Sequence, residues 1–312
     1  GLMCRLAAYL GPPAPLSVLL YDPPWSLAEQ AYRPRRQEYG TVNVDGTAVV
    51  WWPPGEAEPL RYATERPPWA DPNLPLLAPR LHATVQLAAV RSATPGLPFG
   101  ADAAPPFLHG GLALAHNGRI EGFRGALGRR LLASLPDDLY GALGPLPLHD
   151  SVLLLLLTAW GRRERPEAGG SGGTVPRLEG PQADPMVAAG PPDGSRSLAG
   201  ALGAAVTRVA GACAEAGERA TLTALAAEHG HLAGVRVAVG LASPALFLHL
   251  PTGPSGSESE AALVASEPLD DRSGWTEVPD RHLLDLSAAG ATLTPLDLNG
   301  LDAGTHTMER SA

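Results

Sequence analysis

The order of its apolar segments constrains the fold of this chain most: strand-like runs come first, helical runs occupy the middle, and strand-like runs return at the end. The predicted strands cover residues 4–11, 47–52, 83–90, 111–116, 234–242, 244–250, 260–266 and 291–296. The predicted helices cover residues 76–82, 120–135, 149–160 and 197–217. Strands on both sides of a helical centre predict an α+β domain in which helices cover two sheets.

One segment interrupts this order. Residues 165–194 contain 7 glycines and 6 prolines with few large apolar side chains. Such a segment buries too little surface to offset the entropy of ordering it. We therefore expect a flexible insertion at about residues 165–196, within a single domain that spans residues 4–312. Residues 1–3 are interpreted as a leader or a cloning scar ahead of that domain.

Charge and cysteine content argue against several classes of protein. The net charge is −9 and no block of lysine or arginine stands out, so we expect no nucleic-acid partner. The longest apolar run, Ser151 to Trp160, is half as long as a membrane span requires, which favours a core helix and no membrane anchor. Two cysteines cannot form a disulfide framework and no export signal is visible, so a cytoplasmic location is predicted.

Cys4 is unusual because it lies so near the start of a chain with only one other cysteine, Cys213. A packed small side chain, a lipid attachment point and a catalytic nucleophile are the three interpretations. Lipidation requires an apolar export segment before the cysteine, and only three residues precede Cys4. If those residues are removed, the α-amine of Cys4, with an ordinary pKa of about 7.7–8.0, can act as the base for its own thiol.

Three further stretches carry groups suited to amide chemistry, although each has a simpler structural interpretation that is stronger by itself. Asn117 and Gly118 offer amide N–H donors for an oxyanion, but Asn-Gly after an apolar strand more often forms a hairpin turn. Arg91, with Thr94 close behind it, can bind a carboxylate or form an ordinary salt bridge. Asp150 begins an apolar helix, either as a cap or as a carboxylate for a substrate ammonium group.

Taken together and in this order, the motifs resemble the class II glutamine amidotransferases of the N-terminal-nucleophile hydrolases, which carry a terminal Cys, then Arg-x-x-Thr, Asn-Gly and Asp-Ser. The match covers roughly 150 residues and is more specific than any one motif. The stretches PRRQEYGTVNVDG, LAAVRSATPGLP and VASEPLDDRSGW are similar to one subfamily. Its members are amidohydrolases that remove glutamate from γ-glutamyl-hercynylcysteine sulfoxide in ergothioneine biosynthesis.

This resemblance implies a four-layer αββα sandwich, in agreement with the order of the segments. The site residues that it implies are Cys4, Arg91, Thr94, Asn117, Gly118 and Asp150. The cysteine is the expected nucleophile and the Asn-Gly pair the expected oxyanion hole. The arginine and threonine hold the glutamyl carboxylate, and the aspartate holds its ammonium group. The resemblance implies a small-molecule γ-glutamyl substrate and requires neither a metal nor an organic cofactor.

Two departures from the family pattern bear on the substrate. Thr47 and Ala48 replace a Trp-Gly pair of many members, which is expected to reshape one wall of the pocket. Pro105 stands where many glutamine-using relatives have histidine, which favours the hydrolase subfamily. Tryptophan faces bind a trimethylammonium group well, and the sequence does not choose among the candidates Trp25, Trp51, Trp52 and Trp69.

Three alternatives stay open: hydrolysis of another γ-glutamyl amide, a glutamine amidotransferase subunit that feeds ammonia to a partner, and a non-catalytic binding module with a degenerate site. No second catalytic domain is recognisable in the sequence, which favours hydrolysis over ammonia transfer. His229 and His231 are two residues apart in a polar stretch without a cysteine or carboxylate cluster, so no metal site is predicted. The sequence does not determine the oligomeric state.

Overall fold

The computed structural model describes residues 4–35, 43–92, 100–144, 146–163, 197–251 and 261–298. The predicted insertion, residues 1–3 and Thr94 lie outside these ranges. Within the described residues the strands form two sheets, and all the strand pairs are antiparallel.

The start of the chain lies in the middle of the first sheet, because β1 pairs with β11 on one side and β4 on the other. The strand order is β12-β10-β11-β1-β4-β2-β3. Its strands are β1 (Arg5–Pro15), β2 (Thr47–Trp52), β3 (Leu60–Thr64), β4 (His82–Val90), β10 (Phe247–His249), β11 (Ala262–Ala265) and β12 (Trp275–Glu277).

The second sheet has the order β14-β13-β8-β7-β6-β5, and the short strand β9 pairs with β7. Its strands are β5 (Phe107–His109), β6 (Leu112–Ile120), β7 (Ala220–Glu228), β8 (His231–Arg236), β9 (Ala238–Val239), β13 (His282–Ser287) and β14 (Gly290–Pro295).

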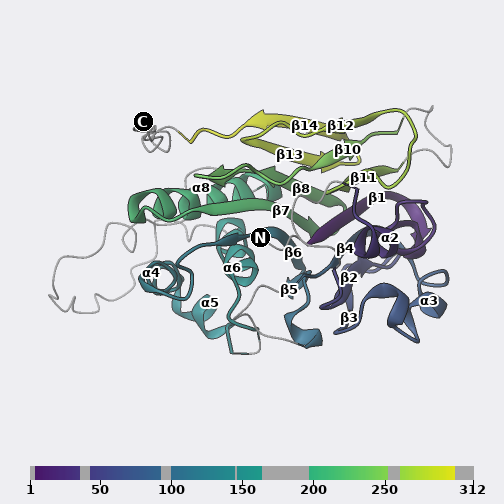
Figure 1. Cartoon of the computed structure of the whole chain (residues 1–312), viewed down its shortest axis with the longest axis horizontal. Helices are drawn as coiled ribbons and strands as arrows, with labels where there is room; N and C mark the ends of the chain where they lie inside the picture. Colours follow the sequence, from purple (N-terminus) through teal and green to yellow (C-terminus); the bar gives the residue numbers. More distant parts are fainter. Residues whose placement is uncertain are drawn as a thin grey trace, which may run out of the picture.

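Helices cover the outer face of each sheet. In Figure 1 the first sheet has α2 and α3 on its right, and the second sheet has α4, α6 and α8 on its left. The helices are α1 (Ser17–Leu20), α2 (Leu27–Tyr32), α3 (Leu74–Leu77), α4 (Ala126–Ala133), α5 (Asp137–Gly141), α6 (Asp150–Arg162) and α8 (Leu198–Ala216). Two 3-10 turns are η1 (Pro68–Ala70) and η2 (Ala101–Ala103).

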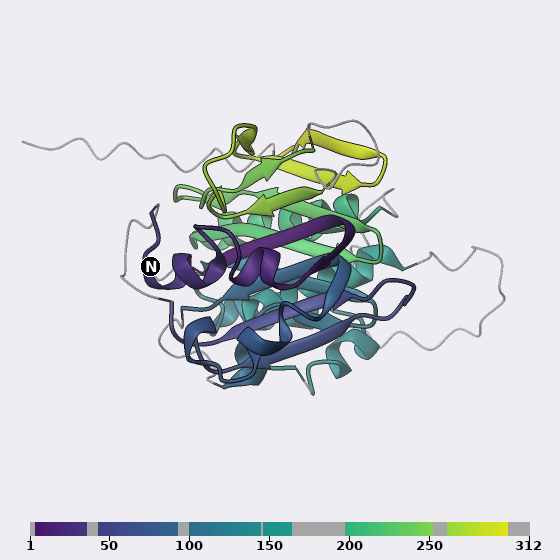
Figure 2. The ribbon, with the colours of Figure 1, turned by 90° about the vertical axis from the view of Figure 1, so that its right-hand side faces the viewer.

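Strand alternation creates three apolar layers, as β1 illustrates. Leu6 and Ala8 face the layer between the two sheets, whereas Ala7 and Tyr9 face the layer under α1 and α2. A third layer separates the second sheet from α4, α6 and α8. Figure 2 shows the N-terminal helices in front of the first sheet and the teal and green helices behind. The predicted four-layer αββα sandwich is therefore confirmed.

The leucine-rich run from Ser151 to Trp160 forms most of α6, as predicted. Residues Val152–Leu157 are buried on all sides, in contact with α8 and β6. The predicted limits of α8 are also confirmed, because the Ser197 side chain accepts the N–H of Gly200 and Gly217 ends the helix with a φ of 66°. Within the described residues, no helix combines the length and apolarity that a membrane crossing needs.

Several local predictions were wrong. The helix expected over residues 120–135 begins only at Ala126, because Ile120 still belongs to β6. The helix expected over residues 76–82 ends at Leu77, and His82 already belongs to β4. The strands β3, β5, β7, β12 and β13 were not predicted. In β7 the commonest residue is alanine, which is depleted in strands.

Candidate active site

The site is built where β1 begins and β4 ends. These strands pair antiparallel with Arg5 opposite Val90, so the same register, extended by one residue, places Cys4 opposite Arg91. Cys4 packs against the apolar layer between the sheets and is partly exposed. Arg91 is only 1% exposed and follows the alternation of Leu87 and Ala89, which face the same layer.

The environment of Cys4 keeps its thiol protonated. Burial raises the pKa of the thiol, and the carboxylate of Asp150 raises it further. The backbone N–H of Ser92, which donates to the sulfur, and the guanidinium groups of Arg91 and Arg5 lower it without reversing the net effect. Attack by this sulfur therefore needs a base at neutral pH. The charges that act on the thiol also show that Arg91 and Asp150 lie close to Cys4.

Asp150 lies at the first turn of α6 and is almost completely buried. Its Oδ2 accepts the N–H of Ile120 at 3.2 Å, and its Oδ1 accepts the N–H of Ser151 at 2.8 Å. Burial by itself raises the pKa of this carboxyl, but His149 foremost and His116 outweigh burial and hold the pKa well below its usual range. Asp150 is therefore an ionised carboxylate, suited to pairing with a cation.

Asn117 and Gly118 lie inside β6, so the interpretation of Asn-Gly as a hairpin turn was wrong. Asn117 alternates with Ala113 and Ala115 and therefore faces the layer between the sheets, on the same side as Cys4. Its side chain is buried, and its Oδ1 has no hydrogen-bond partner within the described part of the chain. A buried amide without a full set of partners is available for a ligand.

Gly118 is required by packing. A Cβ atom at this position would overlap the carbonyl oxygen of Thr221 on β7 and would lie 2.7 Å from Nε2 of His116. The space that a side chain would fill is therefore used by the bond between His116 Nε2 and Thr221 O, which is 2.8 Å long. The sequence motif had suggested only an unobstructed backbone N–H at this glycine.

A buried ion pair anchors the strand that carries Cys4. Arg5 and Glu267 lie 3.1 Å apart, with side chains only 2% and 1% exposed. Next to them, Ser266 Oγ accepts the N–H of Leu6, and the N–H of Ser266 donates to the carbonyl of Leu6. Glu267 also accepts the backbone N–H of Arg35 at 3.0 Å. Ser266 and Glu267 were visible only as part of the SEPLDD motif, and their role in holding β1 was not predicted.

Asp45 and Gly46 hold the backbone of Arg91. The N–H of Asp45 donates to the carbonyl of Arg91 at 3.1 Å, and the N–H of Arg91 donates to the carbonyl of Gly46 at 2.8 Å. The divergent residues Thr47 and Ala48 follow directly in β2 and are fully buried. The departure from the family pattern therefore lies within the first sheet, beside the arginine.

The four tryptophan candidates have different environments. Trp51 and Trp52 are buried in the core on opposite faces of the first sheet, so they stabilise the fold. Trp69 is 45% exposed. The ring of Trp25 carries the guanidinium of Arg35 at 4.1 Å, which shows that this aromatic face accepts a cation.

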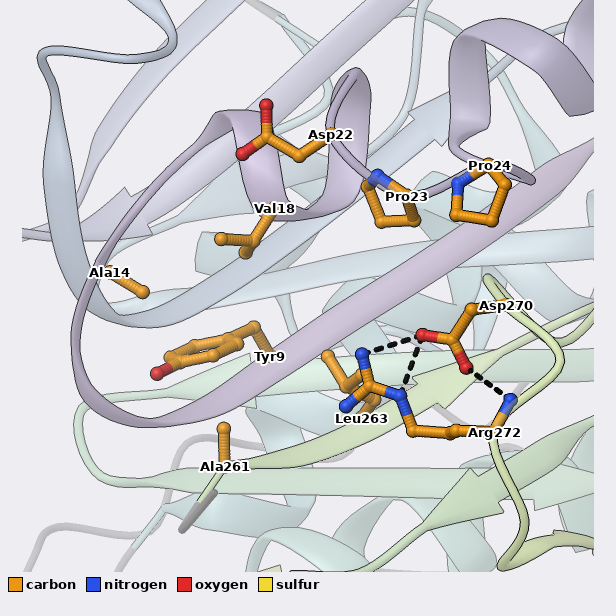
Figure 3. Close-up of a pocket in the computed structure, with 10 residues that line it drawn as sticks. All are labelled: Tyr9, Ala14, Val18, Asp22, Pro23, Pro24, Ala261, Leu263, Asp270 and Arg272. Atoms are coloured by element: carbon orange, nitrogen blue, oxygen red, sulfur yellow. Dashed lines mark hydrogen bonds and ion pairs between the residues drawn. The ribbon is translucent and has the colours of Figure 1, made fainter. Parts of the chain in front are cut away.

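A pocket of about 580 Å³ lies on the outer face of the first sheet, away from the layer that contains Cys4 (Figure 3). Tyr9 and Leu263 form part of its floor, and Asp270 and Arg272 lie at one end. These two charges are satisfied by each other, with Arg272 Nε donating to Asp270 at 2.7 Å. The pocket contains none of the residues predicted for catalysis. In the described part of the chain, no three His, Cys, Asp or Glu side chains gather as a metal site would require.

Comparison with known proteins adds independent information. No family model matches the chain. Two curated relatives are named γ-glutamyl-hercynylcysteine sulfoxide hydrolase. The protein of Mycolicibacterium smegmatis is 33% identical over 294 residues, which cover 94% of this chain and 100% of the relative. That of Mycobacterium tuberculosis is 32% identical over 95% of this chain and 97% of the relative. A probable glutamine amidotransferase of Saccharomyces cerevisiae is 32% identical over 44% of this chain and 40% of its own length.

Solved structures show the same fold. A glutamine aminotransferase class-II domain protein from Silicibacter pomeroyi superposes with a TM-score of 0.58 at 21% identity, over 94% of this chain and 99% of that one. A glutamine phosphoribosylpyrophosphate amidotransferase from B. subtilis superposes with a TM-score of 0.55 at 15% identity, over 95% of this chain and 50% of that one. The fold is therefore that of the N-terminal-nucleophile glutamine amidotransferases.

Proposed function

This chain belongs to the family of the γ-glutamyl-hercynylcysteine sulfoxide hydrolases, and from this premise we propose that it hydrolyses the γ-glutamyl amide bond of γ-glutamyl-hercynylcysteine sulfoxide. The products are glutamate and hercynylcysteine sulfoxide. The observation that supports this function most directly is the meeting of Cys4, Arg91 and Asp150 where β1 begins and β4 ends, with Asn117 facing the same layer.

In the proposed reaction, Cys4 is the nucleophile after the residues before it have been removed. Its sulfur attacks the γ-carbonyl carbon of the substrate, and its own α-amine accepts the thiol proton. The side-chain amide of Asn117 and the N–H of Gly118 donate to the oxyanion of the tetrahedral intermediate. The C–N bond then breaks, the α-amine returns the proton to the leaving amine, and water hydrolyses the thioester to release glutamate.

The glutamyl group is held by charge. Arg91 pairs with its α-carboxylate, with Thr94 as a second donor, and Asp150 pairs with its α-ammonium. The charges of Arg91 and Asp150 support these roles, because both act on the Cys4 thiol and Asp150 also acts on Arg91. A zwitterionic amino-acid head group is thereby matched by one cation and one anion.

Glutamate release tests this proposal. The protein with Cys4 at its N-terminus is incubated with γ-glutamyl-hercynylcysteine sulfoxide, γ-glutamylcysteine and glutamine at equal concentrations. The highest kcat/KM is expected for the sulfoxide, and Cys4→Ala is expected to abolish release from all three. Preference for glutamine would instead support an amidotransferase subunit, which the partial match to the yeast protein makes the second candidate. Unchanged release by Cys4→Ala would exclude this mechanism.

A further inference from the structure

The carboxylate of Asp150 is held by more groups than a helix cap requires. Oδ1 accepts the N–H of Ser151 at 2.8 Å, and Oδ2 accepts the N–H of Ile120 at 3.2 Å. The imidazole of His149, the residue just before α6, places its Nδ1 2.8 Å from Oδ1. A carboxylate has about four acceptor positions. Within the described part of the chain, three of them are used by the protein, which leaves one on Oδ2 for a ligand.

The geometry assigns the proton of His149. If Nδ1 carried no hydrogen, its lone pair would face a carboxylate oxygen at 2.8 Å, which is repulsive. Nδ1 also lies 3.1 Å from the backbone nitrogen of Ser151, but that N–H has a shorter bond to Asp150 Oδ1. The imidazole N–H therefore donates to the carboxylate, and His149 is a donor at this helix start.

His116, on β6 of the second sheet, lies beside the same carboxylate. Its side chain is completely buried, and its Nε2 carries a hydrogen because its partner at 2.8 Å, the carbonyl of Thr221, can only accept. Its Nδ1 then faces Ser151 Oγ at 3.5 Å and Asp150 Oδ1 at 3.7 Å. The imidazole has room for this orientation because residue 118 is glycine.

We infer that His149 is a positioning residue for the reaction, which orients the Asp150 carboxylate so that its one remaining acceptor meets the α-ammonium of the substrate. This inference rests on the proposed function, in which Asp150 binds that group. Without the bond from His149, only the backbone N–H groups of Ile120 and Ser151 hold the carboxylate, and the direction of its remaining acceptor is less closely fixed. His149 thereby sets how strongly the site prefers a γ-glutamyl group over a glutaryl group, which lacks the ammonium.

Two capping residues at position 149 isolate this effect. Asparagine and serine both begin helices well, but only asparagine places an N–H donor near the position of Nδ1. We define discrimination as kcat/KM for a γ-glutamyl amide divided by kcat/KM for the glutaryl amide of the same amine. His149→Asn is expected to keep it within threefold of the wild-type protein. His149→Ser is expected to lower it roughly 10-fold or more, as for loss of a hydrogen bond to a charged group.

Two additional variants serve as controls for this test. His149→Gln preserves bulk but reaches past Oδ1, so it is expected to behave as His149→Ser does. His231→Ala removes an exposed histidine at the start of β8 and serves as the matched control, with unchanged discrimination expected. Thermal unfolding of each variant confirms that it is folded at the assay temperature.

The outcomes separate the two proposals. Unchanged discrimination in both His149→Ser and His149→Gln would overturn the positioning role alone. This holds whether kcat/KM falls equally for the two amides or does not fall at all. Absence of glutamate release by the wild-type protein would overturn the proposed function and this inference together. A selective loss on the γ-glutamyl amide that asparagine restores would establish the role of His149.

Discussion

Cys4 and Arg91 lie opposite each other, one residue beyond the Arg5–Val90 pair of the β1–β4 ladder. Strand pairing therefore brings a guanidinium beside a thiol that is distant from it in sequence. The cation lowers the pKa of the thiol, but burial has the larger effect and the pKa stays above its ordinary value. The pairing thus places the positive charge of Arg91 near the sulfur, but the thiol stays protonated at neutral pH.

The raised pKa predicts how Cys4 reacts with iodoacetamide. Only the thiolate reacts, so labelling is expected to be slow at pH 7 and to rise with pH beyond the range where free cysteine is already fully reactive. Arg91→Leu removes a charge that favours the thiolate, so the profile should move to higher pH. Cys213, with a pKa raised to about 12 and a buried side chain, should stay unlabelled. Labelling of Cys4 at the rate of free cysteine at pH 7 would contradict this account.

Removal of residues 1–3 is predicted to control activity. With these residues attached, the nitrogen of Cys4 is an amide and cannot accept the thiol proton. Because general base catalysis contributes about 10²- to 10⁴-fold, kcat should fall by at least about 100-fold. Intact-mass measurement together with glutamate release compares the two forms of the protein. Equal turnover by both forms would remove the terminal amine from the mechanism.

Asn117→Ala is predicted to act on the transition state. Loss of one oxyanion donor lowers kcat by about 10²- to 10³-fold, and KM for the γ-glutamyl substrate should change little. Steady-state kinetics of the variant and of the His231→Ala control give both constants. A raised KM with unchanged kcat would instead assign Asn117 to substrate binding.

Gly118→Ala is predicted to destabilise the protein, because the added methyl group overlaps Thr221 O and displaces His116. Overpacking of this kind costs about 1–3 kcal/mol of unfolding free energy. Gly111→Ala is the matched control, since a Cβ atom there meets nothing within 4 Å. Urea unfolding measures both variants. Equal stability of the two would show that the strands shift to accept the methyl group at no cost.

Glu267→Ala is predicted to loosen the strand that carries Cys4. It breaks the buried ion pair with Arg5, and removal of one partner of such a pair costs about 3–5 kcal/mol. The exposed pair of Glu29 and Arg33 supplies the control, and Glu29→Ala should change the unfolding free energy by about 0.5 kcal/mol. Similar losses in the two variants, measured by urea unfolding, would contradict a structural role for the buried pair.

Much of the fold follows from local pattern. Apolar runs and turn residues predicted β1, β2, β4 and β6, and the caps of α8 predicted its limits, because these signals act over a few neighbouring residues. The strand β7 was missed because its commonest residue, alanine, is a poor indicator of strand structure. The order of four motifs along the chain was enough to indicate the family, because it can be read without knowing the structure of the segments between the motifs.

The reactive groups follow from the amino-acid sequence: a thiol at Cys4, a guanidinium at Arg91, an amide at Asn117 and a carboxylate at Asp150. The contacts that hold these groups in place follow instead from the packing of the folded chain. The bond from the N–H of Ile120 to Asp150, the space that Gly118 leaves between His116 and Thr221, and the ion pair of Glu267 with Arg5 all join residues through packing. Such contacts depend on which faces of the strands pack together. They also depend on which positions are buried, because an unpaired charge is costly only there. No local pattern encodes either condition, because both arise only when distant segments pack together.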